Sequence, residues 1–315
     1  LQNPGVDDFI THELPFLRQY DVKIIANISG NTPEEYGILC QKLSDAGVDM
    51  IEVNVSCPNV KCGGLQYGVV PEMTAEVTEV AKKHSAVPVM VKLSPMLDWH
   101  KTVADFAGAV HEVHIVSTGN ECKELLLVLG RGRYASPLVV CANDEQVLSY
   151  KAGDNSDNHT TISDSALAAR NTCNTEDSLS EESANDFDSS HWKYLYEPNA
   201  SIMKAGCFDV LEQRFAVHHI SPNSHLFVAA EPIADFPGRS FAIESIATMN
   251  NKELKQLLAG LTHANIAVRN FPLTVAQLRK KLKLKDGGST YLFATTDAQG
   301  RHLVLRTEKR KSGSL

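Results

Sequence analysis

Along the first 95 residues, apolar runs of strand length alternate with stretches in which apolar residues recur at helical spacing. The three strand-like runs cover residues 21–29, 49–55 and 87–93. A capping box at Thr32 opens the first helical stretch and Gly47 closes it, and a second helical stretch covers 71–85. Near-continuous apolar strands that alternate with amphipathic helices predict a parallel sheet buried on both faces.

Beyond residue 96 the pattern changes to short strands joined by tight turns. Residues 112–118 alternate polar and apolar side chains, Gly119-Asn120 supplies a turn, and 122–129 is strongly apolar. A further strand is expected at 138–142. Because hairpin-connected strands are antiparallel, residues 96–142 are predicted to form α+β structure and no further parallel βα units.

Residues 143–191 are acidic and polar, with few large apolar side chains. Such a segment buries little surface, which predicts a long loop or linker. From Trp192 onward the pattern predicts an α+β domain over 192–311, beginning with a helix over 200–215 that breaks at Gly206. Strands are expected at 225–230, 239–247, 264–269, 290–296 and 301–307, and further helices at 250–261 and 274–284.

The composition is that of a soluble globular protein, since 43% of the residues are hydrophobic and 22% are charged. A length of 315 residues accommodates two or three domains. No apolar run approaches the roughly 18 residues of a membrane span, and no signal-peptide pattern is visible, so a cytoplasmic protein is predicted. The first residue is Leu1, which suggests a processed chain or a fragment. The seven cysteines and 12 histidines lack zinc-ligand spacing, so reduced thiols and no metal site are predicted.

The net charge of −8 hides a strong asymmetry along the chain. Residues 265–315 contain eleven Lys and Arg against three acidic residues, whereas 142–200 contain twelve acidic residues. Blocks of opposite charge predict separate modules, of which the basic one binds a polyanion. The candidate contacts are Arg269, Arg279, Lys280, Lys281 and Lys283. The alternative is a solvated helix face that serves solubility.

A polar side chain stands at the end of each of the three N-terminal strands. Asn27 ends the first strand, Asn54 and Cys57 end the second, and Lys92 ends the third. Ligands bind at the carboxyl ends of parallel strands, so these groups are expected to meet at one rim. The alternative is that Asn27 and Asn54 fasten loops and that Cys57 is a small buried apolar residue.

The motifs NVSCPN at 54–59 and VKLSP at 91–95, with the stretches 1–5 and 24–27, resemble class 1B dihydroorotate dehydrogenases. The catalytic subunit of that family is an FMN-dependent (β/α)8 barrel that oxidises dihydroorotate to orotate in pyrimidine biosynthesis. The resemblance implies that Cys57 is the base that takes a proton from the substrate. It further implies substrate contacts at Leu1, Asn54 and Asn59, and FMN contacts at Asn27, Asn54 and Lys92.

The N-terminal segment departs from that family in size. A (β/α)8 barrel needs about eight strands in roughly 250 residues, and residues 1–95 supply three. The glycine-rich phosphate loops that the family carries do not follow Pro95. The segment is therefore predicted to be a partial barrel that does not bind FMN by itself.

A second resemblance is carried by residues 93–99, 112–129, 196–201, 235–239, 267–273 and 282–288. These stretches resemble the C-terminal region of a Bacteroidetes class I S-adenosylmethionine-dependent methyltransferase, which comprises a ferredoxin-like and a THUMP-like domain. The resemblance implies RNA recognition. No strand followed by a glycine-rich turn and an acidic residue appears after Met96, so the S-adenosylmethionine-binding core is absent and methyl transfer is not expected.

Together these patterns predict a chimera of mixed α/β and α+β class. A partial barrel at 1–95 is followed by a ferredoxin-like segment at 96–142, a linker at 143–191 and a THUMP-like domain at 192–311. Residues 92–95 fit both families, so recombination or faulty assembly at a shared stretch would create this junction. The leading hypothesis is a chimeric fragment without turnover. The alternatives are an active dihydroorotate dehydrogenase that uses Cys57 and an RNA-binding module.

Overall fold

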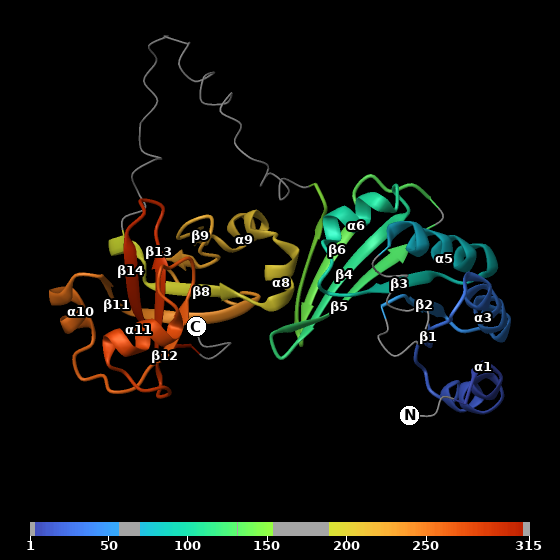
Figure 1. The fold of residues 1–315 in the computed structure, drawn as a ribbon, viewed down its shortest axis with the longest axis horizontal. Helices are drawn as coiled ribbons and strands as arrows, with labels where there is room; N and C mark the ends of the chain where they lie inside the picture. Colours follow the sequence, from blue (N-terminus) through green and yellow to red (C-terminus); the bar gives the residue numbers. More distant parts are fainter. Residues whose placement is uncertain (1–3, 57–69, 131, 154–188, 311–315) are drawn as a thin grey trace, which may run out of the picture. The chain divides into compact units, whose positions relative to one another are not determined.

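A computed structural model describes residues 4–56, 70–130, 132–153 and 189–310. The chain divides into two compact units, Leu1–Gly153 (unit 1) and Asp154–Leu315 (unit 2). Each unit is built on its own seven-stranded sheet (Figure 1). Three predicted site residues, Leu1, Cys57 and Asn59, lie outside the described residues.

Unit 1 begins with the three parallel strands that the sequence predicts. The elements are α1 (Val6–Asp8), η1 (Phe9–Glu13), α2 (Leu14–Leu17), β1 (Ile25–Ile28), α3 (Pro33–Ala46), β2 (Met50–Asn54), α5 (Pro71–His84) and β3 (Val89–Leu93). β2 pairs in parallel with both β1 and β3. The three short helical segments before β1 were not predicted from the sequence.

Helix α3 begins and ends at the residues that its local sequence specifies. The Thr32 side chain accepts a hydrogen bond from the Glu35 backbone N–H at 3.3 Å, and Pro33 occupies the first turn. Gly47 adopts the left-handed conformation at φ 82°, which ends the helix at little steric cost.

The remaining elements of unit 1 continue the same sheet. They are α6 (Trp99–Asp105), β4 (Val110–Thr118), β5 (Glu121–Leu129), β6 (Leu138–Asn143) and β7 (Gln146–Lys151), and the strand order is β1-β2-β3-β5-β4-β6-β7. β5 lies antiparallel between β3 and β4, whereas β6 pairs in parallel with β4. An antiparallel neighbour of β3 ends the run of parallel βα units, so the sheet of the described residues is open and forms no closed barrel.

Two predicted boundaries differ from the structure. Residues 96–142 do not form a separate segment, because β5 pairs with β3 along its whole length and carries the sheet across residue 95. The stretch from 143 begins with a strand and not a loop, because a turn at Asp144-Glu145 returns β7 alongside β6. Leu148 and Tyr150 are buried on β7, which stabilises this short strand despite its polar neighbours.

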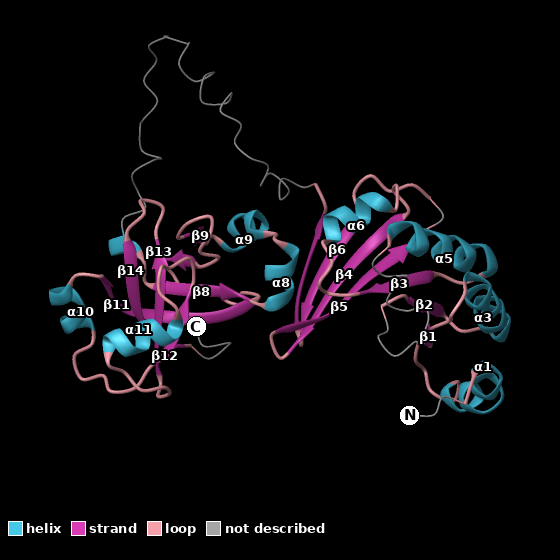
Figure 2. Cartoon of the chain, in the orientation of Figure 1, coloured by secondary structure: helices cyan, strands magenta, loops and turns pink. Residues whose placement is uncertain are grey.

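Helices α3 and α5 cover one face of the parallel strands of unit 1. Helices α3 and α5 pack against each other and against the parallel strands (Figure 2). In β1 and β2 alternate residues, such as Ile51 and Val53, are buried, and the residues between them are half-buried or exposed. In β3 every residue except Lys92 is buried. The prediction of burial on both faces therefore agrees with most of β3 and is wrong for β1 and β2.

Unit 2 is an α+β domain, as the sequence predicts. Its elements are η2 (Ser189–His191), β8 (Tyr194–Pro198), α8 (Ala200–Ala205), α9 (Phe208–Phe215), β9 (His218–His219), β10 (Phe227–Ala229), β11 (Gly238–Thr248), α10 (Asn251–Leu257), β12 (Asn265–Val268), α11 (Val275–Leu282), β13 (Thr290–Thr296) and β14 (His302–Lys309). Gly206 breaks the predicted helix into α8 and α9, and the capping box of Thr274 and Gln277 opens α11.

The sheet of unit 2 is strongly curled. Its strand order is β12-β13-β14-β11-β8-β10-β9, so β13 and β9 lie five strands apart. A flat sheet would separate such strands by roughly 24 Å at about 4.8 Å per strand. The Ser221 hydroxyl just after β9 nevertheless donates to the carbonyl of Thr296 at the end of β13, at 2.7 Å. The curl encloses an aromatic core in which the Phe241 and Phe293 rings lie 4.8 Å apart.

Candidate functional site

The polar residues predicted at the rim of unit 1 share one face of the sheet. Asn54 lies opposite Lys92 on adjacent strands, and Asn27 lies opposite Glu52. Because side chains alternate along a strand, Glu52 and Asn54 point to the same face. The structure therefore brings Asn27, Asn54 and Lys92 together on the face that α3 and α5 leave open.

Each of these three residues has a partner within unit 1. The Asn27 amide donates to the Glu52 carboxylate. The Asn54 side-chain oxygen accepts from the Ser56 backbone N–H at 3.2 Å, and its main-chain carbonyl accepts from the Tyr36 hydroxyl at 3.0 Å. These contacts fasten strand ends and loops, which agrees with the alternative interpretation of the two amides.

The Lys92 amine forms an ion pair with Glu124 on β5, with Nζ 2.7 Å from Oε2. The side chains are 22% and 35% exposed, so both charges are partly shielded from water. Glu124 offsets the positive charge that the resemblance assigns to Lys92 beside a flavin. Sequence reasoning missed Glu124, because it lies beyond the predicted junction and only strand pairing brings it to Lys92. Glu52 was also missed, although its position two residues before Asn54 places it on the same face.

Cys57, the predicted base, and Asn59 and Leu1, the predicted substrate contacts, lie outside the described residues. Among the described cysteines, Cys40 is buried in α3, and this burial raises the pKa of its thiol to about 12. A thiol with that pKa is protonated at neutral pH and does not act as a base.

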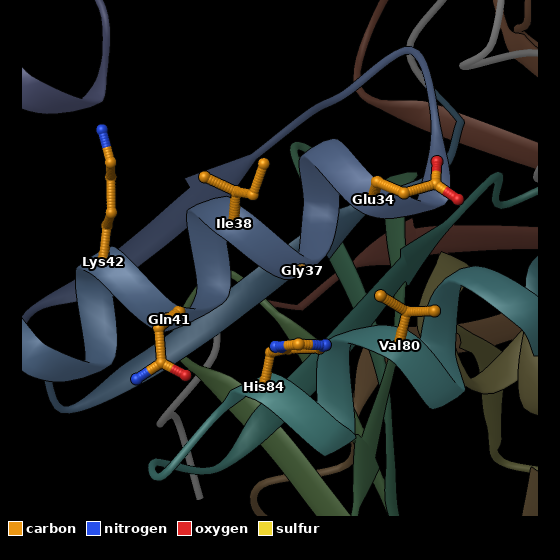
Figure 3. Close-up of a pocket in the computed structure, with 7 residues that line it drawn as sticks. All are labelled: Glu34, Gly37, Ile38, Gln41, Lys42, Val80 and His84. Carbon is orange, nitrogen blue, oxygen red and sulfur yellow. The ribbon is translucent and has the colours of Figure 1, made fainter.

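A shallow groove lies between α3 and α5 on the outer side of unit 1 (Figure 3). Gly37 lies at the closest approach of the two helices, since a Cβ there would lie 2.9 Å from Val80 Cγ1 and 3.2 Å from His84 Cδ2. The groove is bordered by Ile38 and by the flexible polar side chains of Glu34, Gln41 and Lys42. His84 is its only titratable ring and points to no nucleophile or carboxylate partner in the described structure, so the groove reflects helix packing.

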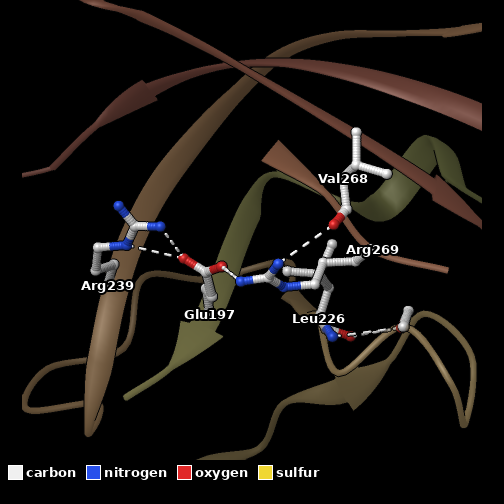
Figure 4. A network of polar contacts seen from close by, with 6 residues as sticks. Glu197, Leu226, Arg239, Val268 and Arg269 are labelled. Carbon is white, nitrogen blue, oxygen red and sulfur yellow. Dashed lines mark hydrogen bonds and ion pairs between the residues drawn. The ribbon is translucent and has the colours of Figure 1, made fainter. Parts of the chain in front are cut away.

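Unit 2 contains a network of two arginines on one buried carboxylate (Figure 4). Arg239 donates to Glu197 Oε2 through Nε at 2.8 Å and also through Nη2. Arg269 donates to Glu197 Oε1 at 2.7 Å and to the carbonyl of Val268 at 3.2 Å. Glu197 was not predicted, and Arg269 was predicted only as one member of the basic C-terminal block.

The other predicted polyanion contacts differ in how exposed they are. Arg279 donates to the carbonyl of Ala264 at 3.0 Å and to the carboxylate of Asp286 at 2.5 Å, so its guanidinium is engaged within unit 2. Lys280, Lys281 and Lys283 are exposed at the C-terminal end of α11, where a helix dipole favours cations. These three lysines present their charge to solvent.

Within the described residues, no three His, Cys, Asp or Glu side chains are grouped in a way that would hold a metal ion. The same part of the chain contains no helix with the length and apolar character of a bilayer span.

Three family models match the chain. The dihydroorotate dehydrogenase model matches residues 1–126, the ferredoxin-like domain model matches 194–237, and the THUMP domain-like model matches 238–309. The first match extends past residue 95 into β5. The ferredoxin-like match lies in unit 2 and not at 96–142, where the sequence analysis placed that domain.

Two curated relatives each match about a third of the chain. The catalytic subunit of dihydroorotate dehydrogenase B (NAD(+)) from Alkaliphilus metalliredigens is 56% identical over 95 residues, which are 30% of this chain and 32% of the relative. The corresponding protein from Exiguobacterium sibiricum is 51% identical over 113 residues, 36% of each chain. The chain thus spans about a third of the length of the curated relatives it matches.

A solved structure resembles most of the chain. The crystal structure of a "putative methyltransferase" from Porphyromonas gingivalis W83 matches with a TM-score of 0.64 at 26% identity, over 88% of this chain and 63% of that one. Residues 96–315 are 220 of the 315 residues, about 70%, so this match also includes part of the first 95. The chain therefore joins a dihydroorotate dehydrogenase-like N-terminal part to a methyltransferase-like C-terminal region, as the sequence predicts.

Proposed function

We propose that this chimeric chain does not oxidise dihydroorotate by itself and that its remaining activity is RNA binding by unit 2. The pairing of β3 with antiparallel β5 carries the first part of the proposal. A (β/α)8 barrel requires a parallel strand next to each of its strands, and β5 occupies that place on β3. No further barrel strand has access to this edge while β5 is paired.

The described residues do not fit FMN in the way that the resemblance implies. Lys92 is the residue that would place positive charge near the flavin, and Glu124 neutralises it at 2.7 Å. Glu52 adds a second carboxylate to the same face through its contact with Asn27. An anionic reduced flavin on this face would meet two carboxylates, which disfavour it.

Flavin binding and turnover test this part of the proposal directly. We expect the purified full chain, incubated with FMN and separated from free cofactor, to show no flavin absorbance and no orotate formation from dihydroorotate. Orotate production with stoichiometric FMN would contradict the proposal.

The alternative is a dehydrogenase in which Cys57 acts as the base, completed by a partner chain. It is favoured by the 56% identity over 95 residues to a catalytic subunit. If activity is found, replacing Cys57 with Ser should lower it by about 100-fold or more, the contribution of a positioned general base. Replacing the buried Cys40 with Ser is the matched control, and equal activity of Cys57→Ser and the unaltered chain would reject this alternative.

The RNA-binding part of the proposal is supported by the THUMP-like match at 238–309 and by the basic surface on α11. Lys280, Lys281 and Lys283 are exposed and carry no ion pair in the described structure. Phosphate contacts by such side chains release counterions, so the affinity should fall with salt. In contrast, Arg279 is held by Asp286 and Ala264 and is expected to contribute little.

Salt-dependent binding of RNA oligonucleotides tests this role. Replacing Lys280, Lys281 and Lys283 with Gln should reduce the slope of log affinity against log salt by about 0.7 for each single-strand phosphate that a lysine neutralises. Lys23, Lys42 and Lys101 of unit 1, changed together, control for the removal of three charges. Binding that ignores both salt and the α11 lysines would contradict the proposal.

The cytoplasm is the proposed location, because the N-terminal part of the chain resembles dihydroorotate dehydrogenases, a family of pyrimidine biosynthesis. Among the described residues of unit 2, the curled and mostly antiparallel sheet offers no crevice of the kind in which parallel sheets bind nucleosides.

A further inference from the structure

The network around Glu197 contains two positive charges and one negative charge. One guanidinium is enough to neutralise Glu197, and two lie on it. The Glu197 side chain is 6% exposed, whereas those of Arg239 and Arg269 are 39% and 41% exposed. The negative charge is therefore buried beneath two guanidinium groups that reach solvent, which leaves a local surplus of one positive charge.

Each guanidinium also has unused hydrogen-bond donors. A guanidinium carries five N–H groups in a fixed plane. Arg239 donates twice to Glu197 Oε2, and Arg269 donates once to Glu197 Oε1 and once to the Val268 carbonyl. In the described structure three N–H groups of each arginine are left without a protein partner, and Figure 4 shows the two arginines on opposite sides of the carboxylate.

The backbone holds this arrangement in place. Arg239 lies opposite Glu197 in the β11–β8 ladder, and Gly238 before it lets the two strands approach closely. A Cβ at Gly238 would lie 2.1 Å from the Glu197 carbonyl oxygen. The Arg269 backbone N–H donates to the Ala294 carbonyl at 2.9 Å, which fixes that residue beside β13. The donors are thus preorganised by strand pairing and by the carboxylate.

Lys309 adds a further positive charge on the same face. It lies opposite Phe241, and Phe241 follows Arg239 by two residues on β11. Residues two apart on a strand share a face, so Lys309 and Arg239 project from the same side of the sheet. Lys309 is exposed. Guanidinium groups bind phosphate oxygens with two parallel N–H groups, and a lysine amine on the same side of the sheet adds a flexible point charge.

We propose that Arg239 and Arg269, oriented by the buried Glu197 carboxylate, form a binding site for a phosphate group of an RNA chain. This inference rests on the proposed RNA-binding function and names residues that contact the ligand apart from the lysines of α11. The guanidinium forks bind phosphate oxygens through the N–H groups that Glu197 and Val268 leave unused.

Single substitutions test the site without leaving a buried charge unpaired. In Arg239→Gln and in Arg269→Gln the other arginine still neutralises Glu197, so both variants should fold. Each should reduce the salt slope of RNA affinity by about 0.7, the value for one phosphate of a single strand. Lys23→Gln in unit 1 removes the same charge from a surface ion pair and should leave the slope unchanged. Slopes equal to that of the unaltered chain in both arginine variants would overturn the site.

Titration of the unaltered full chain with inorganic phosphate is a second test of the site. During a phosphate titration followed by NMR, the side-chain Nε–H signals of Arg239 and Arg269 should shift, while that of Arg306, which is held by Glu244, should not. Unmoved signals at Arg239 and Arg269 would overturn the site. RNA binding that is retained at full salt slope in both arginine variants refutes this inference alone, whereas a chain that binds no RNA refutes the proposed function and this inference together.

Discussion

In both units a buried or half-buried carboxylate forms ion pairs with cations, but the net charge that remains differs between the units. In unit 1, Glu124 pairs with a single Lys92 and offsets its positive charge, which the resemblance assigns to a flavin contact. In unit 2, Glu197 meets two arginines and leaves positive charge at the surface. The comparison shows that a motif residue keeps its chemistry only while its tertiary neighbours leave its charge available.

The units also differ in how their matched segments join. In unit 1 the dihydroorotate dehydrogenase match ends inside β5, which pairs with a motif-bearing strand and changes its surroundings. In unit 2 the ferredoxin-like and THUMP-like matches meet between Pro237 and Gly238, where β11 pairs with β8 and the network around Glu197 spans both segments. Unit 2 is thus expected to unfold as one cooperative body. Substitutions in its network should therefore lower its stability more than corresponding substitutions lower that of unit 1.

The largest effect is expected from Gly238→Ala. The added Cβ would meet the Glu197 carbonyl at 2.1 Å and the Pro198 Cα at 2.9 Å, and both are backbone atoms of a paired strand. Relief of this overlap must separate β11 from β8, which should cost about 3 kcal/mol of unfolding free energy. Hydrogen exchange measured by mass spectrometry should show faster exchange across unit 2 and unchanged exchange in β1–β3. Gly132→Ala, where the nearest atom is a side-chain atom at 3.4 Å, is the matched control, and equal effects of the two changes would contradict the comparison.

A smaller loss is expected from Glu197→Gln. Removing the shared carboxylate charge leaves two guanidinium groups facing each other without an anion between them. Breaking a fully buried pair costs roughly 3–5 kcal/mol, and the partial exposure of both arginines should reduce this to about 2 kcal/mol. Denaturant unfolding of unit 2, followed by the fluorescence of Trp192, provides the measurement. Unchanged stability would show that the network around Glu197 does not hold β8, β11 and the end of β12 together.

The corresponding change in unit 1, Glu124→Gln, should have a small effect. It removes one ion pair whose members are partly exposed, and such pairs contribute about 0.5 kcal/mol. Local exchange in β3 and β5 should therefore change little, because backbone pairing holds the two strands together. A loss as large as that of Glu197→Gln would abolish the contrast between the units.

The smallest effects should appear in acid, where Asp49 of unit 1 and Glu253 of unit 2 each accept hydrogen bonds at a strand end. The Ile24 backbone N–H, and then the Lys23 side chain, hold the pKa of Asp49 below its ordinary value of 3.8. In unit 2 the Thr248 hydroxyl, and then its backbone N–H, lower the pKa of Glu253 below 4.5. A carboxylate whose pKa is lower in the folded state than in the unfolded state stabilises the fold at pH values above its unfolded-state pKa. This stabilisation is lost as the pH falls through the folded-state pKa.

Local hydrogen exchange should therefore accelerate below about pH 3.8 at the start of β1 and below about pH 4.5 at the end of β11. Asp49→Asn and Glu253→Gln should each abolish the local pH dependence in its own unit and leave the other unit unchanged. A pH dependence that survives in both variants would assign the effect to other carboxylates.

Much of the local structure follows from the sequence because its signals are short-range. The Thr32 cap, the Gly47 and Gly206 helix ends and the Thr274–Gln277 box each act within a few residues, and each appears in the structure. The apolar runs likewise determine β1, β2 and β3, and the rim positions of Asn27, Asn54 and Lys92 follow from where those strands end. The two family resemblances could also be recognised from the sequence, since they depend on contiguous motifs.

Only the tertiary structure decided which strands became neighbours. The same apolar run at 121–129 is compatible with a separate domain or with insertion beside β3, and long-range backbone pairing selected the second arrangement. That selection placed Glu124 on Lys92. Other long-range pairings joined the two matched segments of unit 2 at β8 and β11, and stabilised β7 beside β6 in a stretch whose composition predicts a loop. Strand neighbours are chosen by burial and hydrogen bonding between residues far apart in the chain, and a local pattern carries no record of them.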